Sequence, residues 1–468
     1  MSLLDNDRLF PSDSRGLSLA RALFTSICDL PIISPHGHTD PMWFAKDEPF
    51  ENPTALFVTP DHYVFRMLYS QGVTLEELGI SPTDNQEVEI DPRQVWRCFA
   101  SHYYLFRGTP SRLWIDYSLE KVFGIEEVLS QKTADEIYDE INNSLRLPNF
   151  SPRALFDRFN IDVMATTEGA LETLQAHREI ANSSWNGRVI TTYRPDILTD
   201  PDHPNFFESL QSFGKLTNCD PTTWQGYLDA HRSRRKFFRE HGATATDHGH
   251  PTARTANLSL KEAETLFDDV VNGNSTAEQS ELFRAQMLTE MAKMSIDDGM
   301  VMQIHAGSVR NHSSRVYQRF GSDKGFDIPA KADYVNYLRP LLEVVGHEPK
   351  LTVIVFTLDE TTYSRELAPL AGVYPALKLG PPWWFFDSVE GMYRFRKMTT
   401  ETAGFYNTVG FNDDTRAFCS IPARHDIARR VDCSFLASLI TSGRLREDEA
   451  FELAQDLTFN LAKRTYRL

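Results

Sequence analysis

The amino-acid sequence predicts an α/β protein built on a (β/α)8 TIM-type barrel, regular or distorted, with a helical insertion after the first strand. Short apolar segments with strand character alternate with segments of helical periodicity, a pattern that requires parallel strands joined by βαβ crossovers. Most of the expected strands also end in histidine, arginine, aspartate or tryptophan residues. Because a barrel gathers the C-terminal ends of its strands on one face, these residues are expected to form one site.

The chain is expected to divide into three parts. Residues 1–72 form an N-terminal segment with a helix over 17–28 and the first barrel strand over 30–34. Residues 73–150 have a helical pattern rich in aromatic side chains and are interpreted as the inserted helical subdomain. Residues 151–468 would supply the remainder of the barrel and the C-terminal helices.

Seven further strands are expected in the third part, which brings the total to eight. They lie at 161–166, 188–193, 243–247, 300–304, 351–356, 376–379 and 406–411. Helical periodicity is found between most of them, at 152–159, 170–181, 260–271, 278–295 and 330–345.

Composition excludes several classes of partner. The formal net charge is −17, from 48 basic and 65 acidic residues, which argues against nucleic acid or an anionic membrane as the main partner. A small anionic substrate remains compatible with this charge. Five dispersed cysteines without CxxC spacing indicate reduced thiols, and no apolar run reaches the length of a membrane span. A cytoplasmic protein is expected, and a homo-oligomer is left open.

His36 and His38 follow the first strand as a His-x-His pair. Residues i and i+2 of an extended segment point the same way, so both imidazoles can reach one divalent metal ion, most often zinc. The spacing alone is weak evidence, since the chain has 14 histidines and a second such pair at His248 and His250. The alternative is a polar strand-end pair that binds no metal.

Acidic and histidine residues at other strand ends are further candidates. Asp414 follows the last strand and could supply an oxygen ligand or a base, the alternatives being a loop carboxylate or a helix N-cap. Asp413 beside it is expected to face solvent. His305 follows the fifth strand as a third histidine ligand or a neighbour of the metal. His248 is a weaker candidate, and His250 is expected to be a loop residue.

Arg194 and Arg416 also lie at strand ends, where a guanidinium group suits bidentate capture of a carboxylate. The alternative for each arginine is a structural ion pair. The sequence contains no G-x-G-x-x-G opening a helix, no P-loop and no G-x-S-x-G motif. Dinucleotide binding, phosphoryl transfer and serine hydrolysis are therefore not supported.

Aromatic residues could complete a sugar site. Trp383 and Trp384 follow the seventh strand and could wall such a site, although an aromatic pair is more often part of the core. His62 and Tyr63 lie on an expected helix that runs to about residue 70, and their positions alone favour a structural role.

These residues together resemble the uronate isomerase (glucuronate isomerase) family, a divergent branch of the amidohydrolase superfamily. The motifs follow the family order from residue 30 to about residue 430. They are His36-Gly37-His38, Asp61-His62-Tyr63-x-x-Arg66, Tyr193-Arg194-Pro195-Asp196, Gln303-Ile304-His305-x-Gly307-x-x-Arg310-Asn311, Trp383-Trp384-Phe385 and Asp414-x-Arg416-x-Phe418. As in that family, no lysine is evident at the fourth strand to bridge two metals, which favours a single metal ion.

The resemblance implies interconversion of D-glucuronate with D-fructuronate and of D-galacturonate with D-tagaturonate. By similarity, His36, His38 and Asp414 would hold one divalent metal ion, expected to be zinc. Asp414, Tyr63 and Arg416 would act in catalysis. The sugar acid would be contacted by His62, Arg194, His305, Trp383, Trp384 and Arg416.

Three points stay open at this stage. Either Asp414 or Tyr63 could move the proton between C2 and C1, and metal binding by Asp414 would favour Tyr63. Asp413 departs from the family pattern and could raise the pKa of Asp414 if the two carboxylates approach. A metal-dependent hydrolase acting on a lactone, an amide or a deaminable substrate is the alternative, and a sugar-acid-binding barrel without catalysis is a second one.

Overall fold

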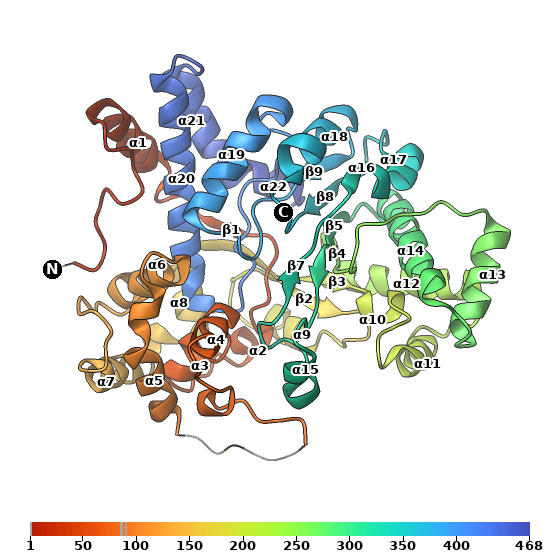
Figure 1. The fold of residues 1–468 in the computed structure, drawn as a ribbon, viewed down its shortest axis with the longest axis horizontal. Helices are drawn as coiled ribbons and strands as arrows, with labels where there is room; N and C mark the ends of the chain where they lie inside the picture. Colours follow the sequence, from red (N-terminus) through yellow and green to blue (C-terminus); the bar gives the residue numbers. More distant parts are fainter. Residues whose placement is uncertain (1, 85–87, 89–90) are drawn as a thin grey trace.

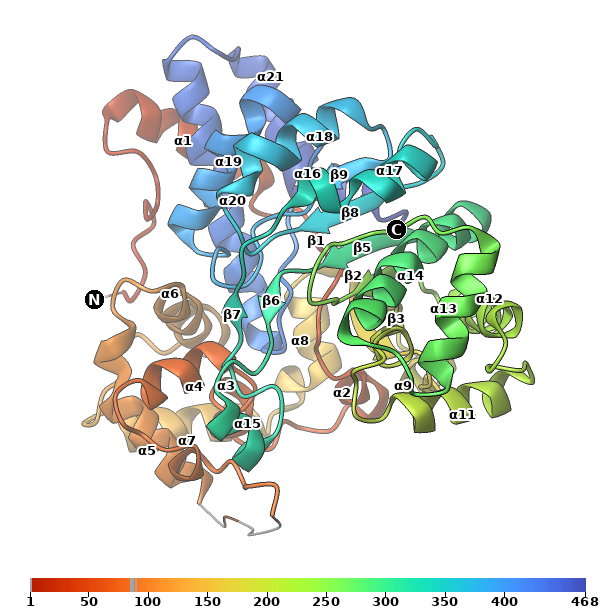
Figure 2. The ribbon, with the colours of Figure 1, turned by 45° about the vertical axis from the view of Figure 1, so that its right-hand side comes forward.

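The core of the protein is a curled sheet of seven parallel strands with helices around it (Figures 1 and 2), seen in a computed structural model that describes residues 2–84, 88 and 91–468. The strands are β1 Ile32–Ser34, β2 Ile161–Gly169, β3 Val189–Arg194, β4 Ala245–His248, β5 Val301–His305, β8 Val353–Phe356 and β9 Leu377–Leu379, and they pair in that order. Each lies where the sequence predicts a strand, and their order along the sheet follows their order in the chain.

The strands are buried on both faces because helices cover the sheet. Every residue of β8 is buried, as is every residue of β5. Continuous apolar runs such as Val353–Phe356 are typical of parallel strands in this position. This double burial explains why the strands are recognisable in the sequence.

The eighth predicted strand, 406–411, is reduced to one parallel bridge between Leu379 and Thr408. Within the described residues, no ladder joins this segment to β1; instead, the backbone N–H of His38 donates to the carbonyl of Thr415 at 3.1 Å. The barrel is therefore distorted and is open along one seam, as the predicted fold class allows.

The connecting helices agree with prediction in most places. They include α1 Ser14–Ile27, α8 Pro152–Arg158, α9 Gln175–Ala181, α13 Leu260–Val271, α14 Ala277–Asp298, α16 Tyr334–Tyr337 and α17 Arg339–Val345. The helix expected over 330–345 is divided, and Pro340 stands in the first turn of its second part. Further helices, for which no range was predicted, are α11 Phe206–Thr217, α12 Trp224–Glu240, α18 Ala368–Val373 and α19 Val389–Ala403.

A group of helices fills the long connection between β1 and β2 and gathers on one side of the sheet (Figure 1, orange). It contains α2 Pro41–Lys46, α3 Pro53–Phe57, α4 His62–Tyr69, α5 Pro92–Ser101, α6 Pro110–Tyr117 and α7 Ala134–Ser144. Its core is aromatic: Trp96 is buried and donates from Nε1 to the carbonyl of Ala134 at 2.9 Å. The division of the chain at residues 72 and 150 stays a prediction.

The C-terminal helices α20 Ile421–Thr441, α21 Glu447–Gln455 and α22 Leu461–Thr465 pack beside β1 and α1 (Figure 1, blue). Helix α20 is buried along almost its whole length, yet it carries Arg424, Arg429 and Asp432. Nowhere in the described part of the chain is a helix long and apolar enough to cross a bilayer.

Candidate functional site

A cavity of about 690 Å³ opens at the C-terminal ends of the strands, as expected for a barrel. All ten residues selected from the sequence line it, although they come from distant parts of the chain. They are His36, His38, His62, Tyr63, Arg194, His305, Trp383, Trp384, Asp414 and Arg416.

His36, His38 and Asp414 converge where the first strand and the last segment of the barrel meet. Oδ1 of Asp414 lies 3.2 Å from Nε2 of His38 and 3.7 Å from Nε2 of His36. On the other side of the His36 ring, Nδ1 lies 3.4 Å from both Thr167 Oγ1 and Gln303 Nε2. Asp414 has a positive φ of 39°, a conformation that aspartate tolerates better than most residues.

The electrostatics of this group suit metal binding. Burial lowers the pKa of His36 to about 4, so its imidazole is neutral near pH 7, as a metal ligand must be. Burial alone would raise the pKa of Asp414, but His36 and His38 outweigh it and hold the pKa well below its usual range. The neutral imidazole of His36 and the carboxylate of Asp414 are thus suited to bind a cation.

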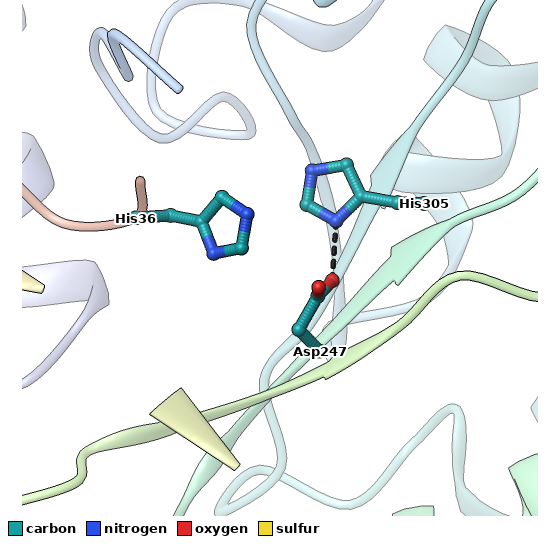
Figure 3. Close-up of side chains that lie close together, drawn as sticks. All are labelled: His36, Asp247 and His305. Atoms are coloured by element: carbon teal, nitrogen blue, oxygen red, sulfur yellow. Dashed lines mark hydrogen bonds and ion pairs between the residues drawn. The ribbon is translucent and has the colours of Figure 1, made fainter. Parts of the chain in front are cut away.

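His305 is oriented by Asp247, at the end of β4 (Figure 3). Its Nδ1 lies 2.5 Å from Oδ1 of Asp247, and the other oxygen of that carboxylate lies 3.3 Å from Nη1 of Arg194. The His305 ring stacks on His36, with ring centroids 4.8 Å apart and an interplanar angle of 21°. Its buried Nε2 has no hydrogen-bond partner among the described residues. The sequence analysis assigned no role to Asp247; the only signal was its place at a strand end.

The donor set fits a divalent metal ion. One nitrogen or carboxylate oxygen from each of His36, His38 and Asp414 lies within 4.8 Å of the others, and the same holds for His36, Asp247 and His305. The unpartnered nitrogen of His305 gives the second group an available donor as well. Nitrogen and oxygen donors in such numbers are typical of zinc and related metals.

The Tyr63 hydroxyl group is hydrogen-bonded on two sides. It donates to Oδ1 of Asp387 at 2.6 Å and accepts the backbone N–H of Phe385 at 2.7 Å. The second oxygen of Asp387 accepts from Nη1 of Arg424 at 2.7 Å. Burial, followed by the Asp387 charge, raises the pKa of Tyr63 well above its usual value. Asp387 and Arg424 also line the cavity, and the sequence analysis identified neither.

Arg194 and Arg416 differ in how closely they are paired with carboxylates of the protein. Arg194 donates from Nε to Asp196 at 2.7 Å and also pairs with Asp247. Arg194 therefore forms ion pairs within the protein, which was the alternative to a role in binding a carboxylate. The side chain of Arg416 is 42% exposed; Nη1 donates to Nε2 of His62 at 3.2 Å, and its nearest described carboxylate is Asp323 at 3.7 Å. Arg416 is therefore the freer cation in the cavity.

The tryptophan pair forms part of the cavity wall. Trp383 meets the ring of His305 edge-on, with centroids 4.7 Å apart, and Trp384 stacks on Phe385 at 4.8 Å. In contrast to these cavity residues, His248 and His250 do not line the cavity. His250 follows β4 in a loop, as expected, but it is buried.

The expectation for Asp413 is wrong. The side chain is only 2% exposed instead of facing solvent, and its Oδ2 accepts a hydrogen bond from Nε2 of His425 at 2.9 Å. The physical reason is that helix α20 covers this side of the chain and supplies the imidazole. Asp413 could raise the pKa of Asp414 only if the two carboxylates approached closely; burial raises this pKa, but His36 and His38 outweigh it and the pKa is lowered.

The chain is similar to known proteins over its full length. Residues 13–466 match the family model described as glucuronate isomerase. A uronate isomerase of Mesorhizobium japonicum is 64% identical, and one of Rhizobium meliloti is 61% identical; the matches cover 100% of this chain and 100% and 99% of those proteins.

Solved structures agree with the sequence matches. The glucuronate isomerase of Caulobacter crescentus superposes with a TM-score of 0.98 at 57% identity, covering 100% of this chain and 98% of that one. The uronate isomerase of Thermotoga maritima gives a TM-score of 0.92 at 26% identity, covering 99% of each chain. By these matches and by the residues gathered in its cavity, the chain belongs to the glucuronate isomerase family.

Proposed function

We propose that the cavity catalyses the reversible aldose–ketose isomerisation of hexuronates, between D-glucuronate and D-fructuronate and between D-galacturonate and D-tagaturonate. The full-length similarity to uronate isomerases supports this activity. The observation that carries the proposal is the convergence of His36, His38 and Asp414 in the same cavity as the exposed guanidinium group of Arg416. An isomerase that handles a sugar acid needs both a polarising centre and a carboxylate site.

His36, His38 and Asp414 would hold one divalent metal ion, for which zinc is the best candidate. When bound, the ion acts as a Lewis acid that polarises a sugar oxygen. His305 is oriented by Asp247 and stacks on His36, and it would contact the sugar.

Arg416 would hold the substrate carboxylate, because its guanidinium group faces the cavity with few competing partners. Arg416 also contacts His62, which would place the His62 imidazole beside the substrate carboxylate. Arg194 is fixed by two carboxylates, so only its remaining N–H donors would be available to the substrate. Trp383 and Trp384 would form one side of the sugar-binding site.

Proton transfer between C2 and C1 falls to Asp414 or Tyr63. The two histidines depress the pKa of Asp414, which weakens it as a base toward a C–H bond. Tyr63 lies in the same cavity and contacts a carboxylate that can exchange a proton with it. These facts favour Tyr63 at carbon and leave Asp414 for a hydroxyl proton during ring opening.

The hydrolase alternative is not favoured. The relatives that match the whole chain are named isomerases, and the end of β4 carries Asp247 and His248 in place of a lysine that could bridge two metals. A binding protein without catalysis has no need for this set of metal ligands. Cytoplasmic location and a homo-oligomeric state stay predictions from the sequence.

The test is NMR of D-glucuronate and D-galacturonate incubated in D2O with the zinc-loaded protein, with the Asp414→Asn variant as a control. Formation of the corresponding ketose by the wild type alone is the expected result. Deuterium in the product would support enediol chemistry with solvent exchange over hydride shift. No turnover of either sugar acid by protein with one zinc per chain would overturn the proposal.

A further inference from the structure

The surroundings of Tyr63 are those of a group that passes a proton on. Its O–H donates to Asp387 at 2.6 Å, while its oxygen accepts the N–H of Phe385 at 2.7 Å. Phe385 has a positive φ of 70°, which is rare for a bulky side chain and often marks a functional site. The backbone is thus held in a costly conformation at the residue whose N–H binds the phenolic oxygen.

Asp387 is fixed between Tyr63 and a buried arginine. It is 8% exposed, and its Oδ2 accepts from Nη1 of Arg424 at 2.7 Å. Arg424 is itself buried and packs over the ring of Trp114, with 3.6 Å from its guanidinium carbon to the ring centroid. Arg424 thus binds one carboxylate oxygen of Asp387 and leaves the other, Oδ1, directed at the Tyr63 hydroxyl group.

The chain contains a second arrangement of the same three residue types. The Tyr103 hydroxyl donates to Oδ1 of Asp116 at 2.8 Å, and Nε of Arg112 donates to Oδ2 of Asp116 at 2.6 Å. Tyr103 is 1% exposed within the aromatic core of the inserted helices. Among the described residues, no backbone N–H donates to its oxygen, and it does not line the cavity of Tyr63. The Tyr103 group is therefore a structural counterpart of the Tyr63 group and a natural control.

We propose that Asp387 is a positioning residue for the isomerisation. It takes the phenolic proton of Tyr63 while Tyr63 takes the proton from C2 of the sugar. This role rests on the proposed function. Phe385 supports it, since its N–H stabilises the negative charge that develops on the phenolic oxygen as the two protons move. Arg424 holds Asp387 in line with Tyr63.

The proton transfers balance as follows. The C2–H bond breaks, its electron pair forms the C1=C2 double bond, and the carbonyl π pair moves to O1. The C2 proton passes to the Tyr63 oxygen, and the proton of Tyr63 passes to Oδ1 of Asp387. After the hydroxyl proton of O2 has passed to O1, the O2 electron pair forms the new carbonyl. Tyr63 then gives a proton to C1 and regains its own from Asp387, so both residues return to their starting forms.

The first experiment measures kcat and KM for D-glucuronate with Asp387→Asn. The asparagine oxygen can still accept the Tyr63 hydrogen bond but cannot take the proton, so kcat should fall about 10²-fold or more. KM should stay within about threefold, because Asp387 acts through Tyr63 and not on the sugar. Asp116→Asn makes the same change in the structural counterpart and should keep kcat within about twofold while lowering the melting temperature.

A double-variant cycle separates proton transfer from packing. If Asp387 acts through Tyr63, adding Asp387→Asn to Tyr63→Phe should slow the reaction no further than Tyr63→Phe alone. The Asp387→Asn/Arg424→Met variant removes the ion pair as a whole, which avoids an unpaired buried cation, and it should be as slow as Asp387→Asn. Circular dichroism and zinc content should match the wild type in each.

The outcomes distinguish this inference from the proposed function. A wild type that isomerises uronates, together with Asp387→Asn or Asp387→Asn/Arg424→Met variants within threefold of its kcat, would overturn the role of Asp387 alone. Multiplicative losses in the Tyr63→Phe/Asp387→Asn cycle would overturn it as well. A wild type that turns over neither uronate would overturn the proposed function and this role with it.

Discussion

Nε2 of His38 lies 3.2 Å from Oδ1 of Asp414, so residues that follow the first and last segments of the barrel meet as one pair of potential metal ligands. Neither group lies in a strand; both belong to the loops at the open seam. The proposed metal site therefore lies between the two ends of the barrel.

Replacing Asp414 by asparagine should release the metal. The amide is a much weaker ligand than the carboxylate, so zinc content should fall well below one per chain and kcat/KM by about 10²-fold or more. Metal analysis after dialysis and uronate turnover measure both effects. Asp413→Asn is the matched control at the neighbouring carboxylate, whose Oδ2 accepts a hydrogen bond from His425. Full zinc content in Asp414→Asn would contradict the ligand assignment.

Arg416→Met should lower kcat/KM for D-glucuronate by about 10²-fold or more, because the substrate carboxylate loses its oriented cation. Steady-state kinetics give the value. Arg339→Met, at an exposed arginine paired with Glu343, serves as the surface control. Activity of Arg416→Met within a few-fold of wild type would show that the carboxylate is held elsewhere.

Glu168 should make stability depend on pH. Burial raises its pKa from an ordinary value near 4.5 to about 7, so the folded state favours the protonated form. This contribution is fully present below pH 4.5 and is lost as the pH rises through 7. Glu168→Gln cannot ionise, so its melting temperature relative to wild type should rise by a few °C between pH 4.5 and 8. A constant difference in calorimetric scans across this range would refute the assignment.

The Arg396–Asp432 ion pair should stabilise the packing of α19 on α20. Both side chains are buried, and two hydrogen bonds of 2.6 and 2.9 Å join them. Arg396→Met leaves an unpaired buried carboxylate and should cost about 3–5 kcal/mol in the free energy of unfolding. Arg444→Met, which breaks the exposed pair with Glu401, should cost less than about 1 kcal/mol. Equal losses in denaturant titrations would contradict this difference.

The sequence predicted much of the fold for a simple physical reason. Parallel strands buried on both faces are apolar throughout, so segments such as Val353–Phe356 stand out between amphipathic helices. The eighth strand was expected to be equivalent to the others and makes only one bridge, because pairing is a property of the assembled sheet. Strand ends gathered in one barrel also explain why His36, Arg194 and Asp414 could be selected together.

The partners of those residues could not be predicted in the same way. Tyr63 and Asp387 are 324 positions apart, and their contact depends on the loop after β9 and on Arg424 from α20. Asp413 was misplaced because nothing local shows that His425 would cover it. Side chains that orient other side chains depend on tertiary packing and leave little periodic signal in the sequence.

The open seam of the barrel lies beside the proposed metal site. Backbone ladders fix the spacing of neighbouring strands whatever the side chains are, whereas the edge between Thr408 and β1 has no ladder in the described part of the chain. There, α20 spans the gap: Arg429 donates to the carbonyls of Cys28 and Leu30, and His425 holds Asp413. We therefore expect substitutions in this helix to change the separation of His38 and Asp414, and with it the size of cation that the proposed site accepts, without disturbing the sheet.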